Sequence, residues 1–281
     1  FDEFIKPYFN NIHILPFFPF SSDDGFSIID YKKIRDDLGG WKDISLLSQD
    51  YRLMADIVIN HASRQSEYFD EFLKGSDAYK DFFISLDKDE GFENVVRPRS
   101  SDLFQEMDIR DKKKYLWCTF GHDQIDLNFK NPEVLLFFIE LIYLYLKNGI
   151  KVFRLDAVAF LWKEKGTNCL NLPQTHEVVK LIRTLLDNYN QNTLLITETN
   201  LPNLENLSYF GNGDEANAIY NFTLPPLLIW TLLMGDSTAL RKWSMSMPPA
   251  KENTTYFNFI ASHDGIGLRP TENILTNQER D

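Results

Sequence analysis

Carboxyl and guanidinium groups stand inside apolar runs at several points of this sequence. The run VFRLDAVAF, residues 152–160, carries Arg154 and Asp156 among apolar side chains. If this run is a strand, alternation puts Arg154 and Asp156 on one face and Leu155 and Ala157 on the other. A neighbouring cation favours an ionised carboxyl group, so we expect a lowered pKa for Asp156 and a carboxylate suited to nucleophilic attack. The alternative is a structural Arg–Asp ion pair.

Two further carboxyl groups follow apolar runs later in the chain. Glu198 lies in ITETN, residues 196–200, and Asp264 lies in ASHDG, residues 261–265. A carboxyl group at a partly apolar strand end tends to have a raised pKa, as a general acid requires. Two carboxyl groups in different environments suit the cleavage of a glycosidic bond, and a separation of about 5–5.5 Å would predict a covalent intermediate and retained configuration. Asp264 would be a third carboxylate, suited to stabilising positive charge on the sugar.

Two histidines accompany these carboxyl groups. His61 ends the run RLMADIVINH, residues 52–61, and His263 directly precedes Asp264. Imidazole N–H groups donate hydrogen bonds, so both histidines are candidate contacts to sugar hydroxyls. The alternative for each is a core histidine whose hydrogen bonds are satisfied within the protein.

The apolar runs predict the scaffold that brings these residues together. Short β-rich runs alternate with longer helical ones, which indicates a parallel sheet covered by helices. Six such units favour an α/β fold of the TIM type, a (β/α)8 barrel, over a doubly wound sheet with its glycine-rich first turn. In a barrel the carboxyl ends of the strands form the catalytic mouth. The predicted strands are 11–18, 52–61, 149–160, 192–200, 217–225 and 254–264, and the predicted helices include 134–146, 175–189 and 227–243.

The predicted barrel is interrupted and incomplete. Residues 62–125 are charged, aromatic and rich in turn residues, which indicates an inserted lobe. We expect a first barrel part at 1–61, the inserted lobe at 62–125 and a second barrel part at 126–281. The first and eighth strands and a C-terminal β-domain are expected to be missing. These residues alone would expose sheet edges, so we expect them to be unstable or poorly active.

Composition argues against several classes of partner. The net charge of −12 disfavours nucleic acid and anionic lipid, because both bind basic surfaces. The apolar run at 134–146 is too short to span a bilayer and contains Glu140, so we predict no membrane segment. Cys118 and Cys169 form no disulfide framework, which favours a cytoplasmic location. We expect a monomer or homodimer that binds small molecules.

Four short motifs carry a family resemblance. DIVINH at 56–61, FRLDAV at 153–158, ITETN at 196–200 and ASHDG at 261–265 resemble, in order and rough spacing, the four motifs of glycoside hydrolase family 13, the α-amylase superfamily. The resemblance extends over nearly the whole chain and implies a (β/α)8 barrel.

The resemblance implies a role for each polar residue of these motifs. Asp156 is similar to the family's nucleophile, and Arg154 to the arginine that orients it. Glu198 matches the general acid/base, and Asp264 matches the transition-state stabiliser. The sugar contacts implied by the same resemblance are His61, His263 and Asp23, the last in the D-x-G-F pattern of residues 23–26.

Within this family the chain resembles the sucrose phosphorylase subgroup. The segments that carry this resemblance are 13–31, 95–100, 120–132 and 224–228. In a phosphorylase, phosphate replaces water in the second step. Arg97 and Arg99 are therefore candidate phosphate ligands, since guanidinium groups bind phosphate in a bidentate manner. A solvated surface pair is the alternative.

Asn200 and Phe160 bear on the substrate. Sucrose-specific members of the subgroup carry histidine at the position of Asn200 and tyrosine near that of Phe160, so sucrose is not favoured. Residues 196–216 resemble members that act on glucosylglycerate, glucosylglycerol or sucrose 6-phosphate. We expect Asn200 to face the acceptor and Phe160 to form an apolar wall beside the donor sugar, with core packing as the alternative for Phe160.

The expected function is that of a retaining glycoside phosphorylase. It would transfer an α-glucosyl group from a small glucoside, such as sucrose, sucrose 6-phosphate or glucosylglycerate, to inorganic phosphate and give α-glucose 1-phosphate. A hydrolase or transglucosylase of the same family is the first alternative, and a non-catalytic binding domain is the second. We expect phosphate as co-substrate but no cofactor and no metal, because the subgroup does not depend on the calcium that many amylases hold at the position of Asn60.

Overall fold

The structure, a computed structural model, describes residues 3–189 and 192–280. Residues 1, 2 and 281, which belong to the predicted barrel parts, lie outside the described residues. The chain divides into two compact units, the first ending at Thr175 and the second beginning at His176. This division falls within helix α4 (Pro173–Tyr189), which confirms the helix predicted at 175–189.

A parallel sheet of three strands forms the centre of the first unit. β1 (Asn11–Ile14) pairs with β2 (Arg52–Val58), and β2 pairs with β8 (Ile150–Asp156). Almost every residue of β2 and β8 is buried, as expected for parallel strands covered on both faces. All three strands are shorter than predicted, and a 3-10 turn, η2 (Val158–Phe160), replaces the predicted end of β8.

Helix α3 (Pro132–Lys147) confirms the helix predicted at 134–146. The side chain of Asn131 accepts a hydrogen bond from the backbone N–H of Glu133 and caps the helix, and proline suits its first turn. The ring of Tyr145, which α3 buries, stacks on Phe18 with centroids 5.3 Å apart. Each large apolar side chain buried in this way stabilises the fold by about 1.5–3 kcal/mol.

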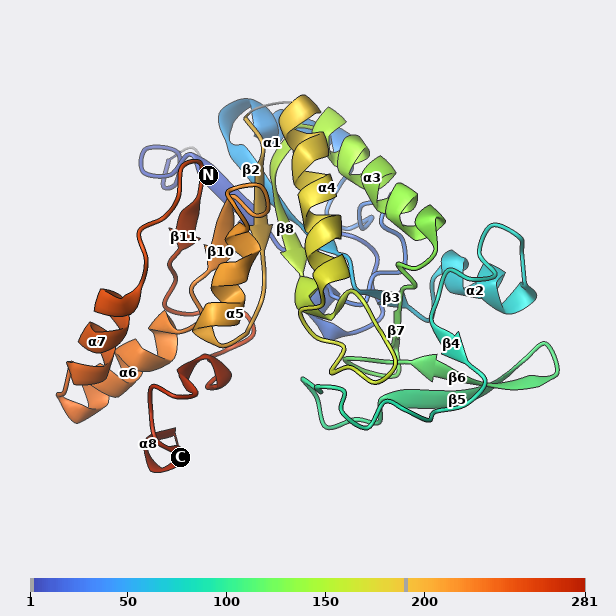
Figure 1. The fold of residues 1–281 in the computed structure, drawn as a ribbon. Coiled ribbons are helices and arrows are strands. Elements are labelled where there is room, and N and C mark those ends of the chain that lie inside the picture. The colour runs from blue at the N-terminus through green and yellow to red at the C-terminus, as the bar shows by residue number, and fades with distance from the viewer. Residues whose placement is uncertain (1–2, 190–191, 281) are drawn as a thin grey trace. The chain divides into compact units, whose positions relative to one another are not determined.

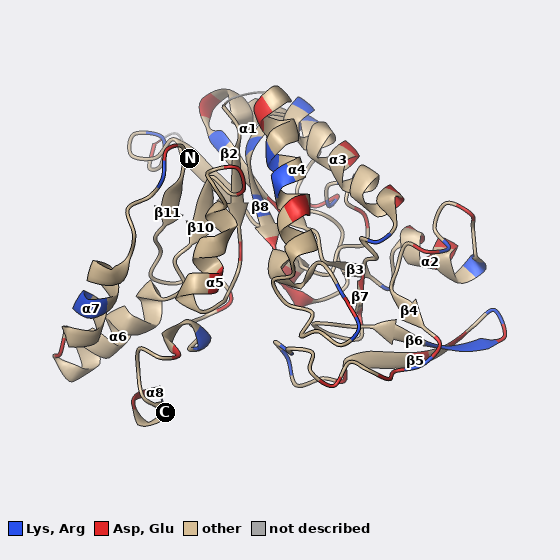
Figure 2. Ribbon diagram, viewed as in Figure 1, with Lys and Arg blue, Asp and Glu red and all other residues tan. Residues whose placement is uncertain are grey.

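Residues 62–125, the predicted inserted lobe, contain an antiparallel sheet. β6 (Lys112–Trp117) lies between β4 (Ser85–Leu86) and β5 (Phe104–Ile109). Lysines gather at the end of the β5–β6 hairpin (Figure 2). A second antiparallel pair, β3 (His61–Ser63) with β7 (Gln124–Asp126), joins the two ends of the lobe. The first unit also contains η1 (Asp23–Gly25), α1 (Trp41–Asp50) and α2 (Glu67–Lys74).

The second unit contains three parallel strands. β10 (Ala218–Tyr220) pairs with β9 (Leu194–Thr197) on one side and with β11 (Thr255–Phe257) on the other. Figure 1 shows β10 and β11 side by side. The remaining elements are α5 (Asn203–Leu207), η3 (Ser208–Phe210), α6 (Leu224–Met234), α7 (Thr238–Ser246), η4 (Arg269–Thr271) and α8 (Asn277–Arg280).

The second unit departs from the predictions in three places. The single helix predicted at 227–243 is two helices, because Gly235 adopts a left-handed conformation with φ of +66° and ends α6. The strand predicted at 217–225 stops at Tyr220, and α6 takes its last residues with prolines in the first turn. The strand predicted at 254–264 stops at Phe257. Across residues 3–189 and 192–280, none of the helices combines the length and apolar character that a membrane span requires.

Candidate active site

Strand β8 carries Arg154 and Asp156 on the same face, as the alternation predicted. Arg154 is 2% exposed, and its Nη1 atom lies 2.7 Å from Oδ1 of Asp156. Asp156 is the last residue of the strand, so its carboxyl group lies at the carboxyl end of the parallel sheet. This is the end at which barrel enzymes place their chemistry.

The same arginine also binds a carboxylate on the neighbouring strand. Asp56 of β2 is the register partner of Arg154, and its Oδ1 atom lies 2.6 Å from Nη1 of Arg154. The other oxygen of Asp56 lies 2.8 Å from Nε2 of His13. Burial opposes the ionisation of Asp56, but the hydrogen bond with His13 and the charge of Arg154 outweigh it and hold the pKa of Asp56 below its ordinary value. Neither Asp56 nor His13 was predicted as a site residue.

The predicted lowering of the pKa of Asp156 is wrong. Burial raises the pKa of Asp156 above its ordinary value, Arg154 opposes this rise, and the negative charge of Asp56 adds to it. Arg154 is shared between two carboxylates, so its charge is not reserved for Asp156. Asp156 therefore takes up a proton at a higher pH than an exposed aspartate does.

The backbone turns sharply after Asp156. Ala157 has φ of +52° and ψ of +27°, which lies in the left-handed region. This conformation costs a residue with a side chain about 1–2 kcal/mol. Such strain gathers at functional sites, where the surrounding structure must hold it in place. Asp23 and Asp24, with φ of +56° and +50°, are in the same region.

His61 lies on β3 and not at the end of β2, where the sequence placed it. It is 2% exposed, and Nε2 lies 2.9 Å from the carbonyl oxygen of Phe26. A carbonyl oxygen only accepts, so Nε2 carries the proton and Nδ1 can accept from the amide of Asn60 at 3.4 Å. The hydroxyl of buried Tyr31 donates to the carbonyl oxygens of both Val58 and His61 and ties this turn together.

Gln124 lies beside both His61 and Asp23. Its Nε2 atom donates to Oδ2 of Asp23 at 2.8 Å and lies 3.1 Å from Nε2 of His61. The neighbouring Asp123 accepts hydrogen bonds from the hydroxyls of three serines, which fix the loop that carries Asp23. These are Ser21, Ser22 and Ser27. The sequence contains no signal for Gln124 by itself, because only the β3–β7 pairing brings it beside His61.

Aromatic rings line the same region. The ring of Phe160 in η2 lies 5.4 Å from that of Phe120, edge to face, and the ring of Phe120 lies 5.2 Å from that of His61. Phe160, which was predicted to form an apolar wall, is half-buried. It lies in a row of rings with Phe120 and with His61, a predicted sugar contact.

The two candidate phosphate ligands differ in their surroundings. Nη2 of Arg99 lies 3.8 Å from Oδ1 of Asp23, and its side chain is 55% exposed. Arg97 instead donates a hydrogen bond to the carbonyl oxygen of Ser101 in its own loop. Arg99 is therefore the one that the structure places beside a predicted sugar contact.

The second unit contains the remaining predicted site residues. Glu198 directly follows β9 and is half-buried, and Asn200 is exposed. Between them, Thr199 donates to the side chain of Asn206 at 2.5 Å, which fixes the backbone that carries Glu198. Nδ2 of Asn200 lies within 2.7 Å of where a β-carbon on Gly267 would stand, so these two residues are in close contact.

His263 and Asp264 lie in a loop, six and seven residues beyond the last residue of β11, and not at a strand end as predicted. Nε2 of His263 is 3.3 Å from Oδ2 of Asp264, and the side chain of Asp264 is 51% exposed. The strand stops at Phe257 although apolar residues, Phe259 and Ile260, follow it in the sequence.

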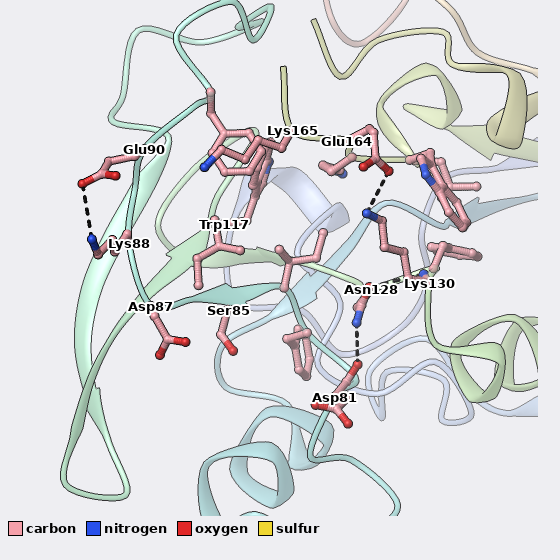
Figure 3. Close-up of a pocket in the computed structure, with 18 residues that line it drawn as sticks. Asp81, Ser85, Asp87, Lys88, Glu90, Trp117, Asn128, Lys130, Glu164 and Lys165 are labelled. Carbon is pink, nitrogen blue, oxygen red and sulfur yellow. Dashed lines mark hydrogen bonds and ion pairs between the residues drawn. The ribbon is translucent and has the colours of Figure 1, made fainter. Parts of the chain in front are cut away.

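A cavity of about 430 Å³ lies between the inserted lobe and the segment 161–165 (Figure 3). At its rim, Nζ of Lys130 lies 2.9 Å from Oε2 of Glu164, and the rings of Trp117 and Trp162 contribute apolar walls. Among the described residues that line this cavity, none is a predicted site residue. The cavity is therefore separate from the cluster around Asp156.

Comparison with known proteins gives one family match and several relatives. A family model described as the α-amylase catalytic domain matches residues 6–265. A glucosylglycerate phosphorylase from Spirochaeta thermophila is 45% identical over 280 residues, 98% of this chain and 48% of that protein. One from Escherichia coli is 44% identical over 279 residues, 99% of this chain and 50% of that protein. A sucrose phosphorylase from Streptococcus mutans is 32% identical over 295 residues, 99% of this chain and 59% of that protein.

A solved structure agrees with these matches. Sucrose 6F-phosphate phosphorylase from Thermoanaerobacter thermosaccharolyticum is similar with a TM-score of 0.87 and 27% identity, over 99% of this chain and 58% of that chain. The chain thus spans about half the length of the glucosylglycerate phosphorylases that it matches.

Proposed function

The chain belongs to the α-amylase catalytic-domain family, and from this membership we propose that the full protein is a retaining glycoside phosphorylase. The predicted (β/α)8 barrel is the fold of this family and is confirmed. The proposed reaction transfers an α-glucosyl group from a small glucoside to inorganic phosphate and releases α-glucose 1-phosphate.

The observation that carries the proposal is the buried carboxyl group of Asp156 at the end of β8. Its partner Arg154 directs one oxygen by a contact of 2.7 Å, and the strained turn at Ala157 follows at once. A carboxylate held in this way can attack an anomeric carbon along one line of approach.

In the proposed first step, an oxygen of Asp156 bonds to C1 of the glucosyl group while the glycosidic C–O bond breaks. Glu198 gives a proton to the departing oxygen. In the second step, a phosphate oxygen bonds to C1 from the face that the leaving group vacated. The bond to Asp156 breaks, and Glu198 takes back the proton. Two inversions give net retention.

Other residues would hold the sugar and the phosphate. The cluster of Asp23, Gln124 and His61 offers both acceptors and donors for sugar hydroxyls. Asp264 would stabilise positive charge on the ring, and His263 would contact its hydroxyls. Arg99 supplies a cation beside Asp23 and is the candidate that we favour for phosphate. Phe160 would limit the access of water, which competes with phosphate for the intermediate.

We propose glucosylglycerate as the glucoside. Two relatives at 44–45% identity are named glucosylglycerate phosphorylases, whereas a sucrose phosphorylase is 32% identical. Asn200, in the place where sucrose-specific members carry histidine, is in keeping with a different acceptor. We also propose a cytoplasmic location, in keeping with the two buried cysteines Cys118 and Cys169, neither of which is in a disulfide.

The test runs the reaction in reverse with the full protein. α-Glucose 1-phosphate is supplied with glycerate, glycerol, fructose or fructose 6-phosphate, and the release of phosphate is followed. The proposal expects the fastest release with glycerate and none from the Asp156→Asn variant. Formation of free glucose at a rate independent of phosphate would instead identify a hydrolase. Turnover by neither route, with sugar binding unchanged in Asp156→Asn, would identify a binding domain.

A further inference from the structure

A buried lysine joins three segments around the candidate site. Lys163 follows η2 and is 7% exposed. Its Nζ atom lies 2.7 Å from Oδ1 of Asn60, 2.6 Å from Oδ2 of Asp126 and 2.5 Å from the carbonyl oxygen of Phe160. An ammonium group has three N–H donors and no acceptor. The three oxygens therefore use the full hydrogen-bonding capacity of this side chain.

Asp126 is equally well satisfied. It is fully buried, and it accepts hydrogen bonds from the backbone N–H of Thr119 at 2.8 Å, from the Thr119 hydroxyl at 2.6 Å and from Nδ2 of Asn60 at 2.9 Å. Lys163 supplies the opposite charge. Burial lowers the pKa of Lys163, and the contact with Asp126 opposes that change. The site is thus a closed network in which each member fixes the others.

The three oxygens belong to segments that carry predicted sugar contacts. Asn60 directly precedes His61, and Asp126 is the register partner of His61 in the β3–β7 pair. Phe160 contributes its carbonyl oxygen to Lys163 and its ring to the aromatic row beside His61. A shift of the ammonium group would therefore move both ends of this row.

We propose that Lys163 is a positioning residue of the donor-sugar pocket, in which its ammonium group holds β3, β7 and the turn after Asp156 in the arrangement that places His61 and Phe160 against the sugar. The inference rests on the proposed function, because it takes this pocket as the one that binds the α-glucosyl group. The competing explanation is that Lys163 only neutralises Asp126 and has no influence on the sugar.

The first test truncates the side chain and returns the missing group. Lys163→Ala removes the atoms of propylammonium, whereas Lys163→Met fills most of the space without a charge. We expect Lys163→Ala to weaken glucose binding by about tenfold or more and added propylammonium to restore it, since small displacements of positioned groups have effects of this size. Lys163→Met should also bind glucose more weakly than wild type, and added propylammonium should not restore its binding. Lys165→Ala, an exposed lysine on the neighbouring cavity (Figure 3), is the matched control and should bind glucose normally.

A second variant covers the case in which Lys163→Ala does not fold. Lys163→Met combined with Asp126→Asn removes both charges together, so no unpaired charge is buried. We expect this double variant to fold with a wild-type near-ultraviolet circular dichroism spectrum and still to bind glucose about tenfold more weakly. Wild-type glucose affinity in the double variant would overturn the proposal and leave charge neutralisation as the role of Lys163.

Kinetics separate positioning from loss of fold. In the full protein, the donor KM should rise in the double variant with a smaller change in kcat, and the acid limb of the pH profile, which reports Asp156, should stay in place. A decrease in kcat with an unchanged donor KM would contradict the proposal. Glucose binding involves no phosphate, so it tests the role of Lys163 even if the enzyme proves to be a hydrolase.

Discussion

Replacing Arg154 by methionine tests the buried chain of charges that holds Asp156. Methionine keeps much of the aliphatic volume but has no charge, so Asp56 and Asp156 lose contacts of 2.6 and 2.7 Å. Removing one partner of a buried ion pair costs about 3–5 kcal/mol, because the remaining charge stays in a site without water. Arg154 is 2% exposed and Asp56 1% exposed, so solvent does not relieve this loss. We expect the free energy of unfolding of the first unit to fall by about 3–5 kcal/mol at pH 7.

The size of this loss should depend on pH. Arg154 lowers the pKa of both carboxyl groups, so both pKa values rise when it is removed. The folded variant then binds more protons than its unfolded chain, and its stability falls as the pH rises through the raised pKa values. The difference from wild type should therefore be largest at pH 7 and should shrink toward about pH 4, the ordinary pKa of aspartate.

Urea unfolding followed by tryptophan fluorescence measures the effect. Wild type, Arg154→Met, Asp56→Asn and the double variant are compared at both pH values. The double variant should be less destabilised than the sum of the two singles, because Asp56→Asn removes one of the two stranded charges. Lys33→Met, which breaks an exposed ion pair with Asp36, is the control and should leave the midpoint unchanged. A loss below about 1 kcal/mol for Arg154→Met, or an equal loss at both pH values, would refute the reasoning.

Further predictions concern turnover in the full protein. Asp156→Asn should slow phosphorolysis by about 10⁴-fold or more, measured as the initial rate of glucose 1-phosphate formation, and a rate within tenfold of wild type would rule out its role as nucleophile. The acid limb of the pH dependence of kcat/KM should report the raised pKa of Asp156, with activity lost as the pH falls through it, and Asp56→Asn should move that limb to lower pH; an unmoved limb would show that Asp56 has no influence. Arg99→Ala should raise the phosphate KM about tenfold while the glucoside KM stays within about twofold, and an unchanged phosphate KM would exclude Arg99 as a ligand. Phe160→Ala should increase the ratio of free glucose to glucose 1-phosphate several-fold, and a constant ratio would argue against its role as a barrier to water.

The sequence predicted the order and type of the elements better than their ends. Each of the six predicted strands contains a strand of the structure, because continuous apolar runs are typical of buried parallel strands. The ends differ because apolarity persists beyond the last ladder hydrogen bond, as in the turn Val158–Phe160. The break between α6 and α7 had a signal, since Gly235 is a typical residue after a helix end.

The local part of the site was predictable, and the part made by distant residues was not. Arg154 and Asp156 are two residues apart, so alternation alone places them on one face. Asp56 joins them across 98 positions of the chain through the parallel register of β2 and β8, and no local pattern shows this. The predicted direction for the pKa of Asp156 was wrong because the burial of its carboxyl group, and to a smaller extent the charge of this second carboxylate, were not taken into account. Lys163 was missed for the same reason, because its partner Asn60 is 103 positions away.

The short β3–β7 pair determines where crossovers between related genes can give a folded chimaeric protein. The chain leaves the barrel through β3 and returns to it through β7. Asp126, the last residue of β7, pairs with His61 of β3 and forms the ion pair with Lys163. A chimaera whose crossovers lie outside residues 60–126 inherits Asn60, His61 and Asp126 from a single parent. A crossover inside the ladder mixes parents at positions that must match one another, and it should yield mostly misfolded progeny. Shuffling libraries built on this chain would therefore sample new lobes most productively when the joints fall before Asn60 and after Lys163, because a joint between Asp126 and Lys163 separates this ammonium group from its partners.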